Sequence, residues 1–218
     1  MARAPGALRR KGFIVLTLAI LGFLYDQPLH GYELKSRITG LTGHVRPVSD
    51  GALYPAITRL EKAGLLHRRT EPGSGAVPRQ TLELTAAGRA ELRRRLGDPE
   101  QAEITDQIRF FALAAFLHHL ADPARQAAVL RRRLDFLEAP SSFFYDGQGR
   151  PVTAEREPNP FRRGMLLVAR ASGAAERAWL AETIAQLAGA GAAGAGDAGG
   201  SGTSGGTGAA GAPGASGA

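Results

Sequence analysis

The chain has 218 residues, of which 44 % are hydrophobic, and it carries a formal net charge of +7. This composition supports a buried core and excludes a chain that is disordered throughout, while the absence of cysteine excludes disulfides and thiolate sites. Residues 1–96 hold 16 Lys and Arg against 7 Asp and Glu, whereas residues 97–218 hold 11 against 13. On charge alone, a nucleic-acid partner and an ordinary basic surface fit the first half equally well.

The first residues predict an arm followed by a buried helix. Residues 1–11 are small, polar and proline-containing, so we expect a flexible basic arm. The run Phe13–Leu24 is apolar on nearly every face, but a membrane-spanning helix needs roughly 20 residues and this run is shorter. A second, short helix is expected from Gly31 to about Thr39. His30 precedes it with no second ligand at metal spacing, which favours capping or packing.

A third helix is indicated by S-D-G-A-L-Y-P-A-I-T-R-L-E-K-A-G-L at 49–65. Its apolar residues recur at helical spacing: Leu53, Ile57, Leu60 and Leu65. Ser49 offers an N-cap oxygen and Gly64 a left-handed stop. Pro55 lacks a backbone donor and belongs in a first turn, so either the regular helix begins near Leu53 or its start is distorted. Tyr54, Thr58 and Arg59 project from the opposite face, where they are available to a partner.

After Gly64 the period of the pattern changes, and Leu65–Glu71 and Arg79–Leu84 predict two strands of a hairpin. Leu82 and Leu84 are expected to face inward, and Thr81 and Glu83 to face water. Three arginines stand in the two strands: Arg68, Arg69 and Arg79. A short helix followed by a basic hairpin is the layout of a winged helix.

Three motifs resemble the PadR family of bacterial transcriptional regulators: P-L-H-G-Y-E-L-K at 28–35, the run at 49–65, and L-E-L-T-A-A-G at 82–88. The resemblance covers roughly residues 10–97, in order and at the family's spacings. It departs at Gln80, Thr81 and Leu82, where the family usually carries lysine and tyrosine. The resemblance implies a winged helix-turn-helix that binds DNA, and a helical C-terminal region through which the protein dimerises.

Further helices are expected beyond the hairpin. Thr85 is placed to cap one helix, and Gly97-Asp98-Pro99 marks a domain boundary. Residues 103–119 indicate one helix with two apolar sides, which suggests packing within the chain and against something more. His118 and His119 are adjacent on it, which is poor geometry for chelation. A helix from Pro123 to about Leu137 leaves the arginines at 131–133 mostly exposed.

The last third contains a loop, a helix and a tail. Residues 140–160 carry turn signals and three aromatic residues, and long loops of this kind are usually functional or disordered. A helix is expected from Phe161 to about Leu187. Its Trp179 is the only tryptophan, and it has either a packing role or a role as one wall of an aromatic-lined effector pocket. Residues 189–218 are nearly all Gly, Ala, Ser and Thr, which predicts a disordered tail.

The expected fold class is mainly α with a small β-hairpin wing. The expected divisions are a basic arm at 1–11, a DNA-binding winged helix at 12–97, a helical dimerisation and effector region at 98–188, and a tail at 189–218. No catalytic motif is present, so we expect no enzyme, and we expect no metal and no cofactor.

The expected function is that of a cytoplasmic, sequence-specific DNA-binding regulator. The resemblance implies a homodimeric repressor, with a pseudo-palindromic double-stranded operator and a small aromatic effector as partners. The alternative is a winged helix used for protein contacts alone. The residues expected at DNA are Ser49, Tyr54, Thr58, Arg59, Lys62, Arg68, Arg69 and Arg79. Those expected at the dimer interface are Phe110, Leu113, Leu117, Leu180, Ile184 and Leu187.

Overall fold

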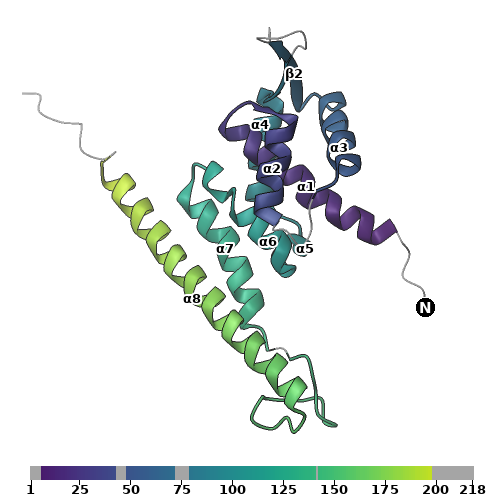
Figure 1. The fold of residues 1–218 in the computed structure, drawn as a ribbon. Coiled ribbons are helices and arrows are strands. Elements are labelled where there is room, and N and C mark those ends of the chain that lie inside the picture. The colour runs from purple at the N-terminus through teal and green to yellow at the C-terminus, as the bar shows by residue number, and fades with distance from the viewer. Residues whose placement is uncertain (1–5, 43–47, 72–78, 141, 198–218) are drawn as a thin grey trace, which may run out of the picture.

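The computed structural model describes residues 6–42, 48–71, 79–140 and 142–197 (Figure 1). In chain order the elements are α1 (Gly6–Asp26), β1 (Leu29–His30), α2 (Gly31–Thr42), α3 (Asp50–Lys62), β2 (Leu66–Glu71), β3 (Arg79–Leu84), α4 (Ala86–Gly97), α5 (Gln101–Thr105), α6 (Gln107–Ala114), the 3-10 turn η1 (Leu117–His119), α7 (Pro123–Glu138) and α8 (Pro160–Asp197). The fold is mostly helical with one small antiparallel sheet, which confirms the predicted fold class.

The helix α1 is the centre of the first part of the chain. Its apolar residues from Leu18 to Leu21, together with Leu24, are almost fully removed from solvent, and α2, α3, α4 and α6 all pack against it. Each leucine or isoleucine buried in this way contributes about 1.5–3 kcal/mol. The helix begins at Gly6 rather than at Phe13, so it includes residues 6–11 of the expected arm. Leucine, arginine and lysine in that stretch are good helix formers, which accounts for the difference.

The sheet has three strands in the order β1-β3-β2, one more than the predicted hairpin. The added strand β1 pairs with β3 through Leu29 opposite Leu82 and His30 opposite Thr81. Leu82 and Leu84 are buried, as predicted, but Thr81 is buried too and not turned to water. The strand β1 covers Thr81, and the Thr81 hydroxyl lies 3.5 Å from His30 Nδ1.

The single helix predicted at 103–119 is wrong, because the chain forms α5, α6 and η1 there instead. The break falls at Asp106, whose side chain accepts hydrogen bonds from the backbone N–H groups of Ile108 and Arg109 and so starts a new helix. One apolar side of the predicted helix is buried in the chain's own core, whereas Ile108 and Phe111 of the other side are exposed.

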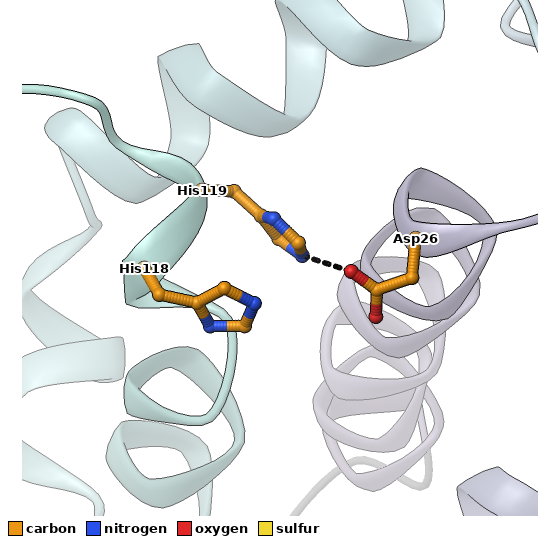
Figure 2. A group of neighbouring side chains, drawn as sticks. All are labelled: Asp26, His118 and His119. Carbon is orange, nitrogen blue, oxygen red and sulfur yellow. Dashed lines mark ion pairs between the residues drawn. The ribbon is translucent and has the colours of Figure 1, made fainter.

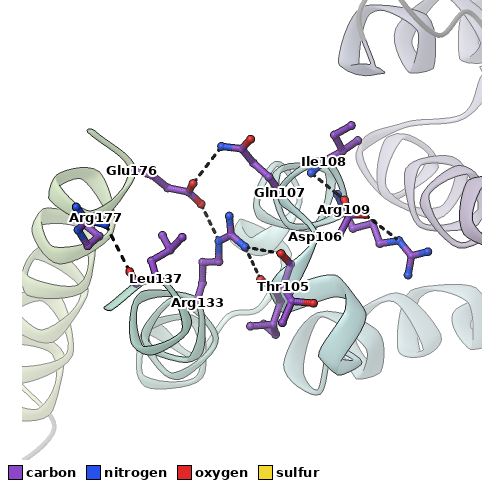
Figure 3. Close-up of polar contacts among 10 residues, drawn as sticks. Thr105, Asp106, Gln107, Ile108, Arg109, Arg133, Leu137, Glu176 and Arg177 are labelled. Atoms are coloured by element: carbon purple, nitrogen blue, oxygen red, sulfur yellow. Dashed lines mark hydrogen bonds and ion pairs between the residues drawn. The ribbon is translucent and has the colours of Figure 1, made fainter. Parts of the chain in front are cut away.

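The helices α7 and α8 lie side by side and antiparallel, and the chain between them forms the loop at one end of the molecule (Figure 1). Arg133 of α7 is buried, which corrects its expected exposure. Its Nε donates to Glu176 Oε1 of α8 at 2.7 Å, and its Nη1 donates to the Ile104 and Thr105 carbonyls at 2.7 and 3.1 Å (Figure 3). Gln107 of α6 donates to the other Glu176 oxygen at 3.2 Å. One buried ion pair thus joins α5, α6, α7 and α8.

The helix α8 continues to Asp197, past the predicted start of the tail at 189. Alanine has the highest helix propensity and recurs through residues 188–195, which lets the helix continue in spite of the glycines. The rest of the predicted tail lies outside the described residues. Among the residues that the structure describes, no helix combines the length and the apolar character needed to cross a membrane.

Candidate nucleic-acid interface

The helix α3 begins where the sequence places it, but its cap differs. Ser49 stands at the N-cap with extended backbone angles, and its side chain makes no capping hydrogen bond. Its carbonyl accepts from the N–H groups of Ala52 and Leu53, both at 3.0 Å. Asp50, in the first turn, pairs with Lys35 Nζ of α2 at 2.8 Å. This ion pair ties the second and third helices together at the start of α3.

Pro55 lies inside α3, so the helix does not begin near Leu53, which was the first of the two alternatives. The helix begins at Asp50, and Pro55 follows more than one turn later. Because Pro55 has no N–H, the carbonyl of Gly51 lacks its usual donor four residues on. Both residues are exposed, so water reaches that carbonyl.

The end of α3 fixes the direction of the wing. Gly64 has φ +70°, the N–H of Gly64 donates to Glu61 O, and the N–H of Leu65 donates to Leu60 O, both at 2.9 Å. This pattern is a Schellman motif, which satisfies the last carbonyls of the helix and turns the chain into β2. Thr85 Oγ1 donates to Gly64 O at 2.7 Å and accepts from Gly88 N at 3.0 Å. One hydroxyl therefore holds the turn and caps α4.

The helix α3 has a buried side and an exposed side. The buried side consists of Leu53, Ala56, Ile57 and Leu60. On the other side Tyr54 is 46 % exposed, Arg59 and Lys62 are exposed, and Thr58 is half-buried. The structure thus places four of the residues expected at DNA on one helix, and the side chains of all four remain at least partly exposed.

The wing places Arg68 beside this helix. Arg68 lies opposite Leu82 and Arg69 opposite Thr81 in the ladder, and both arginines are exposed. Arg68 Nε lies 3.3 Å from Glu61 Oε2, which ties β2 to the last turn of α3. Arg79 begins β3, but its side chain and the tip of the hairpin lie outside the described residues.

A pocket of about 380 Å³ lies between α3, the sheet and the start of α2. It is lined by His30, Gly31, Tyr32, Tyr54, Ile57, Arg68, Gln80 and Leu82. His30 Nδ1 lies 3.1 Å from Gln80 O, and its ring stacks on Tyr32, which is 68 % exposed. The sequence analysis assigned neither Tyr32 nor Gln80 to a site.

The C-terminal residues expected at a dimer interface lie mostly inside one chain, which corrects that expectation. Phe110, Leu113, Leu117, Leu180 and Ile184 are all buried, and Leu187 is partly buried. Phe110 and Leu113 face inward because α6 packs on α1, whereas Leu180 and Ile184 belong to α8, which packs on α7. The exposed apolar residues of α6 and α8 are a different set: Ile108, Phe111, Phe161, Met165, Leu167, Val168 and Trp179.

Trp179 packs on a neighbouring helix and also lines a pocket. Its ring centroid lies 6.4 Å from those of Phe110 and Phe111, so it packs on α6. It is also 41 % exposed and forms a wall of an open pocket of about 510 Å³ between α6 and α8. The other lining residues are Gln107, Phe111, Ala114, Ala115, Ser172, Ala175 and Glu176.

Comparison with known proteins supports the family resemblance that the sequence motifs of the first half indicated. Residues 20–94 match the model of the Transcriptional regulator PadR-like family. This match confirms the family resemblance of the three sequence motifs and covers α1 from Ile20 to the end region of α4. No curated protein sequence matches the chain.

Several solved structures align with most of this chain. Bacillus subtilis PadR in complex with operator DNA is 22 % identical, with 79 % of this chain and 97 % of that chain covered and a TM-score of 0.38. The same protein in complex with p-coumaric acid is 22 % identical, with 79 % of this chain and 98 % of that chain covered and a TM-score of 0.36. The PadR-like transcriptional regulator BC1756 from Bacillus cereus is 17 % identical, with 78 % of this chain and 94 % of that chain covered and a TM-score of 0.36.

Proposed function

Because residues 20–94 carry the PadR-like family match, we propose that the chain is a sequence-specific DNA-binding transcriptional regulator. The observation that carries the proposal is the coincidence of this match with the exposed side of α3. The matched segment presents Tyr54, Arg59 and Lys62 on one helix, next to the arginines of β2.

In this proposal α3 enters the major groove and the wing follows the phosphate backbone. Tyr54, Thr58 and Arg59 reach base edges, Ser49 and Lys62 lie at the two ends of the helix near phosphates, and Arg68, Arg69 and Arg79 contact phosphates from the wing. The basic excess of residues 1–96 supplies the sequence-independent attraction. The unit that binds DNA is residues 12–97, and residues 98–188 form the second unit.

We further propose that the protein acts in the cytoplasm as a homodimeric repressor. Met165, Leu167 and Val168 on α8 are at least half exposed, and apolar surface of this kind is typical of an interface between subunits. Two copies related by a two-fold axis read a pseudo-palindromic operator with half-sites about 34 Å apart. A small aromatic effector that enters the pocket at Trp179 releases the DNA by binding the released state more tightly.

The test is selection of bound DNA from a random duplex library, followed by measurement of the affinity for the selected site at several salt concentrations. Arg59→Ala is expected to weaken specific binding by about 1–3 kcal/mol, because a lost base contact costs that much. Arg131→Ala, at an exposed arginine of α7 with the same change in charge, is the control and is expected to bind as the parent does.

Two results would contradict the proposal. If no sequence is enriched from the library, the winged helix serves protein contacts and not DNA recognition. If Arg59→Ala and Arg131→Ala lose the same small affinity, the contribution is one of overall charge, and α3 does not read bases.

A further inference from the structure

Three side chains from two distant parts of the chain converge beside the core. They are Asp26, the last residue of α1, and His118 and His119 of η1, and Figure 2 shows all three directed at one spot. One nitrogen or oxygen atom from each lies within 4.8 Å of the others. The histidine rings lie with centroids 4.0 Å apart, although adjacent residues on a helix point in different directions. The short 3-10 turn brings them together.

The buried nitrogen of His119 faces this spot without a hydrogen-bond partner. The side chain of His119 is only 5 % exposed, and its Nε2 makes no hydrogen bond. In the neutral tautomer that carries its proton on Nδ1, Nε2 presents a lone pair, and this is the form in which a histidine ligates a metal through Nε2.

A carboxylate oxygen lies close to this nitrogen. Asp26 Oδ1 lies 3.5 Å from His119 Nε2. Two atoms that both present lone pairs are not stabilised by facing each other, whereas a cation between them binds both. The C-terminal end of α1 adds partial negative charge at Asp26. The guanidinium of Arg89 lies close by but is directed to the Tyr25 carbonyl at 2.9 Å.

The distances suit a small divalent ion. Zinc binds histidine nitrogen and carboxylate oxygen at about 2.0–2.2 Å, which places the ligand atoms of a tetrahedral site about 3.3–3.5 Å apart. The pair formed by His119 Nε2 and Asp26 Oδ1 already has this separation. His118 is exposed, so its ring turns without disturbing the core, and Asp26 is 47 % exposed, which leaves an entry path from solvent.

We propose that Asp26, His118 and His119 bind a divalent first-row transition metal ion of the Zn²⁺ type, with water in the fourth position. Two imidazoles and one carboxylate favour such an ion over Mg²⁺ or Ca²⁺, which prefer oxygen ligands throughout. The ion bridges α1 to η1, and so connects the winged helix to the C-terminal helices. The proposal rests on the side chains alone and is independent of DNA binding.

The experiment is calorimetric titration of the full-length, tag-free protein with ZnCl₂ after chelator treatment, with MgCl₂ as the comparison ion. One equivalent of Zn²⁺ is expected to bind, and Mg²⁺ is expected to give no heat of binding. Zinc at about 100 times its Kd is expected to raise the Tm by roughly 5 °C, because it binds the folded chain. Co²⁺ as a spectroscopic substitute is expected to show visible absorption bands of a four- or five-coordinate site.

Three variants decide the assignment. His118→Gln changes an exposed side chain, so it is expected to fold normally and to weaken Zn²⁺ at least tenfold, and Asp26→Asn is expected to do the same. His67→Gln removes an exposed histidine of β2 outside the cluster and is expected to bind Zn²⁺ as the parent does. If His118→Gln binds as tightly as the parent, or if the parent binds no Zn²⁺ and its Tm does not move, the contact between His119 and Asp26 is a proton-mediated ion pair and the proposal is wrong.

Discussion

Arg133 and Glu176 form an ion pair with 2.7 Å between Nε and Oε1, and their side chains are only 3 % and 4 % exposed. A pair buried this deeply is costly to break from one side, because the remaining charge stays in the core without a partner. The Ile104 and Thr105 carbonyls satisfy Arg133 further, and Gln107 satisfies Glu176. The position of α8 on the rest of the chain therefore depends on this contact.

We expect Arg133→Ala to lower the free energy of unfolding by about 3–5 kcal/mol, since it leaves the Glu176 carboxylate buried and unpaired. Urea unfolding followed by circular dichroism measures the loss. Arg131→Ala, two residues earlier and exposed, is the control and is expected to change stability by less than about 0.5 kcal/mol. Equal losses in the two variants would mean that the ion pair contributes no more than a surface arginine does.

Gly88 is expected to tolerate no side chain. A Cβ at this position would lie 2.0 Å from the Leu65 carbonyl oxygen, which belongs to the backbone and cannot turn aside. Gly88→Ala is therefore expected to cost about 1–3 kcal/mol through forced backbone movement. Gly164→Ala in α8 has nothing within 4 Å and is expected to stabilise by about 0.5–1 kcal/mol, because alanine is the better helix former. Thermal unfolding of both variants tests the contrast, and stabilisation by Gly88→Ala would contradict the close packing.

Trp179 is expected to report occupancy of the pocket between α6 and α8. Because it is the only tryptophan, its emission has a single source. Anilinonaphthalene sulfonate, a flat aromatic probe, is expected to bind there and to quench Trp179 emission saturably by energy transfer. Ala115→Leu fills the pocket and is expected to weaken this binding, whereas Ala128→Leu on α7 is the control. Quenching that Ala115→Leu leaves unchanged would place the probe elsewhere.

Glu91 is expected to make stability depend on pH below about 4.5. Hydrogen bonds from Arg94 at 2.8 Å and Arg95 at 2.7 Å, with the Arg94 contact dominant, lower the pKa of Glu91 from 4.5 to about 2. A carboxyl whose pKa falls on folding stabilises the protein above its unfolded pKa, and the contribution is lost as pH falls through the folded pKa.

The measurement compares the parent with Glu91→Gln by urea unfolding between pH 6 and pH 3. The parent is expected to be more stable by about 0.5–1 kcal/mol at pH 6, as for partly exposed ion pairs, and the difference is expected to shrink as the pH falls below 4.5. A difference that stays constant over this range would show that the glutamate contributes through packing and not through its charge.

The sequence could predict the elements that carry strong local signals. The buried positions of α3, the stop at Gly64 and the cap at Thr85 all follow from residues within one turn of each other, and the structure confirms them. The order of a short helix and a basic hairpin predicted the winged-helix layout, and the family motif at 49–65 supported it.

The missed features depend on contacts between distant residues. The strand β1 has only two residues, too few to show an alternating pattern, and its partner lies about fifty positions away. Arg133 stands in a run of three arginines that is typical of a solvated helix face, and only the arrival of Glu176 makes its burial favourable. The break at Asp106 was missed, because apolar residues at helical spacing on both sides of it favoured one continuous helix.

The helix α8 has 38 residues, so at 1.5 Å per residue it is about 57 Å long, more than twice the length of α7 beside it. The Glu176 contact lies near its middle, 21 positions before Asp197. The buried ion pair fixes one point of α8, and the helix extends far beyond it. If α8 tilts by about 10° about this point, its C-terminal end moves by roughly 5 Å. A shift of the pocket wall at Trp179, one turn from Glu176, is therefore expected to displace the far end of α8 by several times the distance that it moves the wall.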